Sequence, residues 1–298
     1  MYKSTDLLEF IKTFSSEDDC LKYISNIKWP EDSYQCKKCG HKNFCKGKQN
    51  YSRRCTKCKY DESPTAGTMF ERLGFDILRA FHIIYAMSVR KKGISSYEIE
   101  NEFSITQDTC WKFRNKVQGA MKSSENYPLK GRVDVDEFFV GGPEEGKKGR
   151  SHGKKKLCII ALELLPEGKF GRSYMRQIQE SSTKEFRPFF NAHISKDANI
   201  KTDKWVSYTS LTDEYKQLEQ IDSDNGNNFY EIHIQIMNFK GWLRGIHHHC
   251  SKTHMQGYLD EYCFRYNRRN NLDTIFHKLI ERMVNGTKPK IISATEAG

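Results

Sequence analysis

The stretch Arg132-Val133-Asp134-Val135-Asp136-Glu137-Phe138-Phe139-Val140 decides how the larger part of this chain folds. Its first half alternates valine with acidic residues and its second half is apolar, a pattern that predicts a β-strand. A carboxylate within an apolar strand costs free energy unless it is paired or binds a metal ion. Because successive side chains of a strand point to opposite faces, Asp134 and Asp136 share one face and Glu137 points the other way.

The segments after this strand predict a mixed α/β domain, which we expect to span residues 130–290. The elements predicted by periodicity are strands over 157–165, 173–178 and 200–203, a helix over 183–193, and mostly helical structure over 231–285. Several strands followed by helices are typical of a mixed α/β fold.

A second aspartate follows at the end of a predicted strand, where Asp203 closes the run Ile200-Lys201-Thr202-Asp203. Aspartates delivered from neighbouring strands can bracket hard divalent cations, which take oxygen ligands. Two such ions about 3.5–4 Å apart activate a water or a hydroxyl and stabilise the leaving oxygen of a phosphodiester. A pair of aspartates is weak evidence by itself, since nearly every protein contains some.

The segment 231–245 predicts a helix that adds further polar side chains. His233 and Lys240 are seven residues apart, nearly two full turns, and therefore face the same way. Glu231 stands two residues before His233 and projects nearly opposite, so the two side chains are not expected to serve one site.

Four cysteines in two tight pairs, Cys36-x-x-Cys39 and Cys55-x-x-Cys58, predict a structural zinc site within residues 33–62. Each pair places two thiolates on one turn, and a tetrahedral Zn²⁺ ion would join the turns. The alternative is four unrelated reduced cysteines. The segment between the pairs is rich in lysine and arginine, which favours nucleic acid or another protein as a partner.

Helices are expected over residues 1–32, before the cysteines, and over 70–125, after them. The second region resembles a helix-turn-helix, whose second helix begins at Thr106 and shows a polar, basic face. The basic side chains expected to meet DNA on that face are Lys112, Arg114 and Lys116. The alternative is a plain three-helix bundle with a solvated basic face.

The charge balance favours a polyanionic partner. The chain has 298 residues, a net charge of +11 and 37% hydrophobic residues, which makes nucleic acid the first expectation. A membrane surface is the rival, but no apolar run approaches the roughly 18 residues of a spanning helix. The start of the sequence lacks an apolar signal core. We therefore expect a cytoplasmic protein that does not associate with membranes.

These stretches together resemble the DDE-superfamily insertion-sequence transposases of the ISXO-type branch. The resemblance covers nearly the whole chain. Its motifs are the two cysteine pairs, Thr65-Ala66-Gly67-Thr68, the strand from Asp136 to Gly142, Thr202-Asp203-Lys204-Trp205, the block Lys240-Gly241-Trp242-Leu243-Arg244-Gly245, and the tail Phe264-Arg265-Tyr266-Asn267-Arg268-Arg269.

The resemblance implies an RNase H-like catalytic domain preceded by a zinc ribbon and a helix-turn-helix. It implies Asp136, Asp203, His233 and Lys240 as the catalytic set, with Asp136 and Asp203 binding Mg²⁺ or Mn²⁺. In that branch the third position can be Glu, Asn or His. A neutral imidazole suits Mn²⁺ better than Mg²⁺, so His233 could instead act on water or the leaving group.

The resemblance further implies a transposase that binds the terminal inverted repeats of its element, cleaves their ends and joins them to target DNA. It would act as a homodimer on double-stranded DNA and associate with the nucleoid when bound. Lys240 would hold a phosphate. The further arginines expected to contact DNA are Arg244, Arg265, Arg268 and Arg269. The alternatives are a catalytically inactive DNA-binding regulator and a metal-dependent nuclease without strand transfer.

Overall fold

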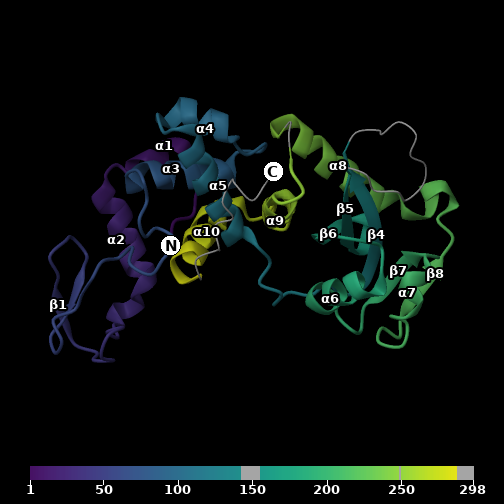
Figure 1. Cartoon of the computed structure of the whole chain (residues 1–298), viewed down its shortest axis with the longest axis horizontal. Coiled ribbons are helices and arrows are strands. Elements are labelled where there is room, and N and C mark those ends of the chain that lie inside the picture. The colour runs from purple at the N-terminus through teal and green to yellow at the C-terminus, as the bar shows by residue number, and fades with distance from the viewer. Residues whose placement is uncertain (142–154, 248–249, 287–298) are drawn as a thin grey trace. The chain divides into compact units, whose positions relative to one another are not determined.

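The structure is a computed structural model that describes residues 1–141, 155–247 and 250–286. The chain forms two compact units (Figure 1). The first comprises Met1–Met121 together with the described residues from Asn270 onward, and the second comprises Lys122–Arg269. The chain therefore leaves the first unit, builds the second, and returns to the first.

The first unit begins with two short helices, α1 (Leu7–Thr13) and α2 (Glu17–Lys28). A capping box separates them, because the Ser16 hydroxyl accepts from the Asp19 backbone N–H and the Asp19 carboxylate accepts from Ser16. Such caps satisfy the free N–H groups of a helix start and fix where the helix begins. Helical structure before the cysteines was expected, and the cap explains why it is not one continuous helix.

A small three-stranded antiparallel sheet carries the cysteine pairs. Its strands are β1 (Phe44–Lys46), β2 (Arg53–Cys55) and β3 (Asp61–Glu62), in the order β1-β2-β3. A 3₁₀ turn, η1 (Pro30–Asp32), leads into it. Trp29, Tyr34, Cys36 and Cys55 form its buried core. A core of this size is too small to stabilise a fold without a staple.

Three helices follow the small sheet: α3 (Ile77–Val89), α4 (Ser96–Phe103) and α5 (Gln107–Met121). Ser95 and Glu98 form a capping box at the start of α4. Ser104 ends that helix in the left-handed conformation, with φ of 52°, and α5 begins directly after Thr106. Two helices joined by a tight turn are the order expected for a helix-turn-helix.

The last described elements, the 3₁₀ turn η4 (Leu272–Thr274) and helix α10 (Ile275–Asn285), belong to the first unit. This corrects the expected boundary of 130–290, of which residues 287–290 lie outside the described residues. The reason is the apolar stripe of α10, which packs against α2, α3 and α5. The ring of Phe276 lies within 5.7 Å of the rings of Tyr2, Phe10, Phe14 and Phe81.

The second unit contains a five-stranded mixed sheet in the order β6-β5-β4-β7-β8. Strand β4 pairs antiparallel with β5 and parallel with β7. Strands β5 and β6 are antiparallel, whereas β7 and β8 are parallel. The strand bounds are β4 (Arg132–Val140), β5 (Lys156–Leu164), β6 (Phe170–Ile178), β7 (Asn199–Asp203) and β8 (Leu218–Ile221). This confirms the predicted mixed α/β class and agrees with an RNase H-like domain behind a zinc ribbon.

Helices cover both faces of the large sheet (Figure 1). Helices α6 (Thr183–His193) and α7 (Val206–Thr209) pack on the face that holds Val133 and Val135. Helices α8 (Tyr230–Ile246) and α9 (Met255–Tyr266) pack on the face that holds Phe138 and Val140. Two 3₁₀ segments complete the unit, η2 (Pro166–Gly168) and η3 (Asp224–Phe229). The alternation of β4 thus directs its even-numbered residues, the two aspartates included, towards α8.

Candidate active site

Asp136 and Asp203 lie on neighbouring parallel strands. The register of β4 with β7 pairs Asp134 with Lys201 as its last position. Two residues further along both strands stand Asp136 and Asp203, so continuing the same register brings them level. Lys201 forms an ion pair with Asp134 at 3.3 Å, which shows that the side chains of Asp134 and Lys201 lie on the same face of the sheet. By the two-residue period of a strand, Asp136 and Asp203 share that face as well.

Tyr208, on α7, lies within electrostatic range of both aspartates. Burial is the main cause that raises the pKa of its phenol, followed by the charge of Glu137 and a hydrogen bond to it, and then by the charges of Asp136 and Asp203. Both aspartates therefore lie near enough to act on one buried group. The Asp203 Oδ1 atom also accepts a hydrogen bond of 3.1 Å from the backbone N–H of Trp205.

Asp134 holds the sheet together below the site. It is fully buried and ion-paired with Lys201 at 3.3 Å and with Arg132 at 3.7 Å. Burial raises the pKa of its carboxyl, and the charges of Lys201 and Arg132 oppose that shift. Two cations within the same cluster suit an anchoring group better than a metal ligand.

Helix α8 brings His233 onto Asp136, with 3.1 Å between His233 Nε2 and Asp136 Oδ2. The hydrogen bond to Asp136 raises the pKa of the imidazole, and partial burial opposes that shift. Protonation of the ring is therefore favoured beside the carboxylate, and Nε2 is the nitrogen that faces it. The family resemblance implied this histidine as a member of the catalytic set, and α8 places it beside Asp136.

Lys240 follows two turns later on the same side of α8. Its ammonium lies over the Phe138 ring, 5.6 Å from the centroid. Burial lowers the pKa of this ammonium, while the negative charge of Asp136 acts in the opposite direction. A partly desolvated cation near a carboxylate cluster is suited to bind a phosphate oxygen.

The donor set of this site is two carboxylates and an imidazole, which suits Mn²⁺ and tolerates Mg²⁺. Among the residues that the structure describes, three or more metal-ligating side chains gather tightly enough to hold an ion only at the four cysteines. At the acidic site, His233 and Asp136 are instead hydrogen-bonded to each other. Within the described residues, Asp136, Asp203 and His233 therefore do not form such a tight group of ligand atoms.

The ligand atoms of the four cysteines, Cys36, Cys39, Cys55 and Cys58, all lie within 4.8 Å of one another. The Sγ atoms of Cys36 and Cys58 are 3.5 Å apart, and those of Cys39 and Cys55 are 3.6 Å apart. Tetrahedral zinc with Zn–S bonds of about 2.3 Å requires S···S distances of about 3.8 Å. Burial opposes ionisation of Cys36, but hydrogen bonds from the backbone of Cys39 and Lys38 help to lower the pKa of its thiol to about 6. The cluster fits a structural zinc ion.

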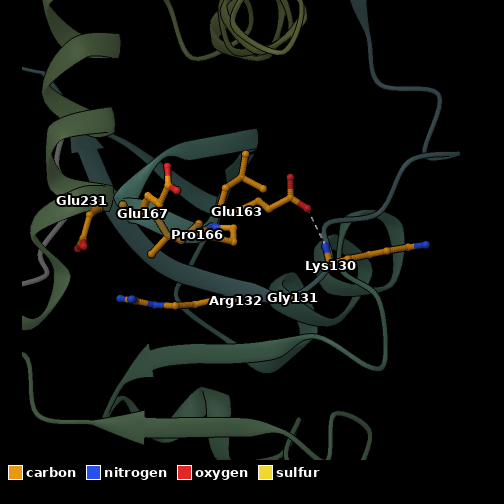
Figure 2. Close-up of a pocket in the computed structure, with 10 residues that line it drawn as sticks. Lys130, Gly131, Arg132, Glu163, Pro166, Glu167 and Glu231 are labelled. Carbon is orange, nitrogen blue, oxygen red and sulfur yellow. Dashed lines mark hydrogen bonds between the residues drawn. The ribbon is translucent and has the colours of Figure 1, made fainter.

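A separate cavity of about 620 Å³ lies at the other end of β4 (Figure 2). It is lined by Lys130, Arg132 and the turn from Pro166 to Gly168, and the Lys130 backbone N–H donates to Glu163 there at 3.0 Å. Glu231 reaches this cavity from α8. His233, on the same helix, reaches Asp136 instead, so the two side chains serve different places, as their spacing predicts.

The helix-turn-helix residues proposed for DNA divide into two groups. Lys112 is exposed on α5 and pairs with Asp108 at 2.6 Å, and Lys116 lies one turn further on the same side. Arg114 corrects the expectation, because it is only 2% exposed and its Nε donates to the Ile94 carbonyl at 3.2 Å. A guanidinium buried on a backbone carbonyl secures packing and is withdrawn from a DNA surface.

The four arginines expected to contact DNA from the second unit differ in their contacts and exposure. The Arg269 guanidinium donates to the carbonyls of Gly171, at 3.2 Å, and Phe170, and Arg268 donates to the Phe264 carbonyl at 3.0 Å. These contacts show that Arg268 and Arg269 secure the end of α9, and their expected contact with DNA stays a prediction. Arg244 is exposed on α8 and Arg265 is partly buried on α9, so Arg244 is the tail arginine best placed for a phosphate.

Sequence reasoning missed two residues that shape the site, Lys201 and Gly226. The signal for Lys201 was its position two residues before Asp203, which places both on one strand face. Gly226 stands in the run Asp224-Asn225-Gly226-Asn227, whose composition is typical of a turn. Nothing in that run alone indicates that the turn contacts His233.

Comparison with known families identifies the second unit. Residues 128–267 match the family model described as the ISXO2-like transposase domain. No curated protein matches the chain. Within the described residues, no helix is both long and apolar enough to cross a membrane. The match begins just before β4 and ends at the close of α9, so it contains both aspartates, His233 and Lys240. The second unit of this chain therefore belongs to the ISXO2-like transposase family, a branch of the DDE superfamily.

Proposed function

We propose that the protein is a DNA transposase that cleaves phosphodiester bonds at the ends of its element and transfers the strands to target DNA. The observation that supports this most directly is the parallel pairing of β4 with β7, whose register, continued by two residues, brings Asp136 level with Asp203, together with the hydrogen bond between His233 and Asp136. Within an RNase H-like sheet, that edge is where a divalent ion and a scissile phosphate would meet.

In this proposal Asp136 and Asp203 hold the divalent ion, Mg²⁺ or Mn²⁺. When bound, such ions lower the pKa of a water or hydroxyl nucleophile and stabilise the leaving oxygen. His233 acts at the same place, either as a nitrogen ligand or as a group that exchanges a proton with the nucleophile or the leaving group. Lys240 holds a phosphate oxygen of the DNA.

The first unit would recruit the DNA. On the helix-turn-helix, Lys112 is exposed and Lys116 is partly buried, and the whole chain has a net charge of +11. Arg244 would extend the contact from the catalytic unit. Because an element has two ends, we propose that two copies of the chain act together, one at each end.

The test is strand cleavage by the purified full-length protein. The substrate is an end-labelled duplex that contains the DNA flanking the gene, incubated with Mg²⁺ or with Mn²⁺. We expect Asp136→Asn and Asp203→Asn each to reduce cleavage at least about 100-fold, because each removes a charged metal ligand from the transition state. Binding of the duplex, measured by fluorescence anisotropy, should be retained.

Asp213→Asn is the matched control, since Asp213 is an exposed aspartate of the same unit, and it should cleave like the unaltered protein. Equal cleavage by all three variants would overturn the proposed catalytic pair. Binding without cleavage under either metal would instead support an inactive DNA-binding regulator.

A further inference from the structure

The ring of His233 rests directly against the backbone of Gly226. A Cβ atom built on Gly226 would lie 2.6 Å from Cε1 and 2.9 Å from Nδ1 of His233. Contacts under 3.0 Å are essentially never tolerated, so any side chain at this position must push the imidazole away. Nε2, the ring atom bonded to Cε1, lies 3.9 Å from that built Cβ and faces Asp136 at 3.1 Å.

The backbone around Gly226 is held in an unfavourable conformation. Asp224, Asn225 and Gly226 have φ angles of 46°, 53° and 93° in succession. Residues in the left-handed conformation usually occur singly. A residue other than glycine in this conformation costs free energy that the surrounding structure must offset. A run of three, immediately beside a residue of the acidic site, indicates that the turn conformation is required there.

Lys201 secures this turn to the sheet. Its ammonium donates to the Asn228 carbonyl at 2.6 Å, lies 4.9 Å from the centroid of the Phe229 ring, and pairs with Asp134 at 3.3 Å. Asp134 stands two residues before Asp136 on β4. The η3 turn is thus tied to the strand that carries the first aspartate.

We propose that Gly226 is a positioning residue for His233. Lys201 holds the turn in place, so the backbone of Gly226 lies directly against the ring. A side chain at residue 226 would occupy the space that the imidazole needs to reach Asp136. The expected effect on catalysis rests on the proposed function. The contact between Gly226 and His233 depends only on how the second unit folds.

The first experiment compares Gly226→Ala with Gly168→Ala in the full-length protein. Gly168 also has a positive φ, +69°, but nothing lies within 4 Å of its added Cβ, so it reproduces the backbone strain without the contact. We expect Gly226→Ala to lower kcat for cleavage at least about 10-fold with KM for DNA within about twofold, because misplacing a reacting group by about 1 Å costs up to 10²-fold. Gly168→Ala should cleave like the unaltered protein.

Gly226→Asn separates the contact from the backbone. Asparagine tolerates the left-handed region better than alanine but still carries a Cβ. We expect it to keep most of the kcat defect. Recovery of full activity in Gly226→Asn would overturn the proposal, because backbone strain alone would then explain the loss.

Thermal unfolding tests the contact without any activity. With His233 present, Gly226→Ala should lower Tm by several degrees more than Gly168→Ala. In a His233→Ala background the two glycine substitutions should lower Tm equally, because the clash has been removed. An excess loss that persists in that background would refute the contact. If the unaltered protein fails to cleave DNA, the proposed function fails, and this cycle still decides the role of Gly226.

Discussion

The hydrogen bond to Asp136 is the largest influence on the pKa of His233, ahead of burial and the charge of Lys240, which act in the opposite direction. Their hydrogen bond of 3.1 Å raises the pKa of the imidazole above its ordinary value of about 6.5. A proton on the ring therefore favours the folded state in the absence of an added divalent ion. This contribution is fully present below pH of about 6.5 and is lost as the pH rises through the higher pKa of the folded state.

His233→Gln should therefore change the pH dependence of stability. Glutamine can still donate to Asp136 but does not titrate. We expect the difference in Tm between the unaltered protein and this variant to be larger at pH 5.5 than at pH 8.5, measured without added Mg²⁺ or Mn²⁺. His41→Gln, at a partly exposed ring of the small sheet, serves as the control. A difference that grows towards alkaline pH would contradict the assignment.

Arg269 and Arg244 should separate stability from DNA binding. Arg269 donates to the carbonyls of Gly171 and Phe170, and hydrogen bonds from a charged group contribute about 1.5–3 kcal/mol. Arg269→Met should lower the free energy of unfolding by that amount in urea titrations. Arg244→Met should change stability by less than about 0.5 kcal/mol but reduce the salt slope of DNA binding by about 1. The reverse pattern would show that Arg269 contacts DNA and that Arg244 does not.

At this scale the sequence predicted positions but not burial. The two-residue period placed Asp134 and Asp136 on one face, and the seven-residue spacing aligned Lys240 with His233. Arg114 was misjudged because its partner, the carbonyl of Ile94, is brought to it only by tertiary packing. The sequence of a helix does not distinguish a basic side chain that faces solvent from one that donates to a neighbouring carbonyl.

Among the elements, the small sheet is the one whose stability we expect to depend on a bound metal ion. Trp29, Tyr34, Cys36 and Cys55 are its buried residues, and the four thiols meet at one point. Because metal binding supplies folding free energy in such modules, the loss of one ligand should unfold the sheet and leave the helices in place.

Cys55→Ser should therefore abolish zinc binding, and Cys45→Ser should not. Cys45 lies on β1 of the same sheet but is exposed and outside the cluster. Zinc per chain, measured by inductively coupled plasma mass spectrometry after gel filtration, should be about one for the unaltered protein and for Cys45→Ser, and near zero for Cys55→Ser. Retention of zinc by Cys55→Ser would show that the cysteine pairs are not its ligands.

The long elements were predictable, whereas among the short strands of the second unit β7 was predicted and β8 was not. Strand β4 follows directly from its alternation, and β5, β6 and α6 follow from apolar runs bounded by turns. Strand β8 has four residues, Leu218–Ile221, too few for a period to stand out. The η3 turn, which carries Gly226, is fixed by contacts with His233 and Lys201 that are distant in sequence, so no local pattern reveals it.

Considered as a whole, the chain inserts its transposase domain into a helical unit. Residues before Lys122 and after Arg269 fold together, so the catalytic unit is bounded by two chain crossings. The sequence did not reveal this, because the amphipathic pattern of α10 indicates a helix and says nothing about which core receives it. The receiving core is aromatic, and Phe276 is fully buried among Tyr2, Phe10, Phe14 and Phe81.

Phe276→Ala should therefore destabilise the helical unit although it lies after the catalytic domain in sequence. Removing a fully buried phenylalanine costs about 3–5 kcal/mol. In differential scanning calorimetry we expect the transition of the helical unit to move to lower temperature, while that of the catalytic unit stays unchanged. Leu272→Ala, at a side chain that is 39% exposed in the neighbouring turn, should move neither transition. Because the two units have separate cores, a Phe276→Ala variant that shifts only the catalytic transition would show that α10 belongs to the catalytic domain after all.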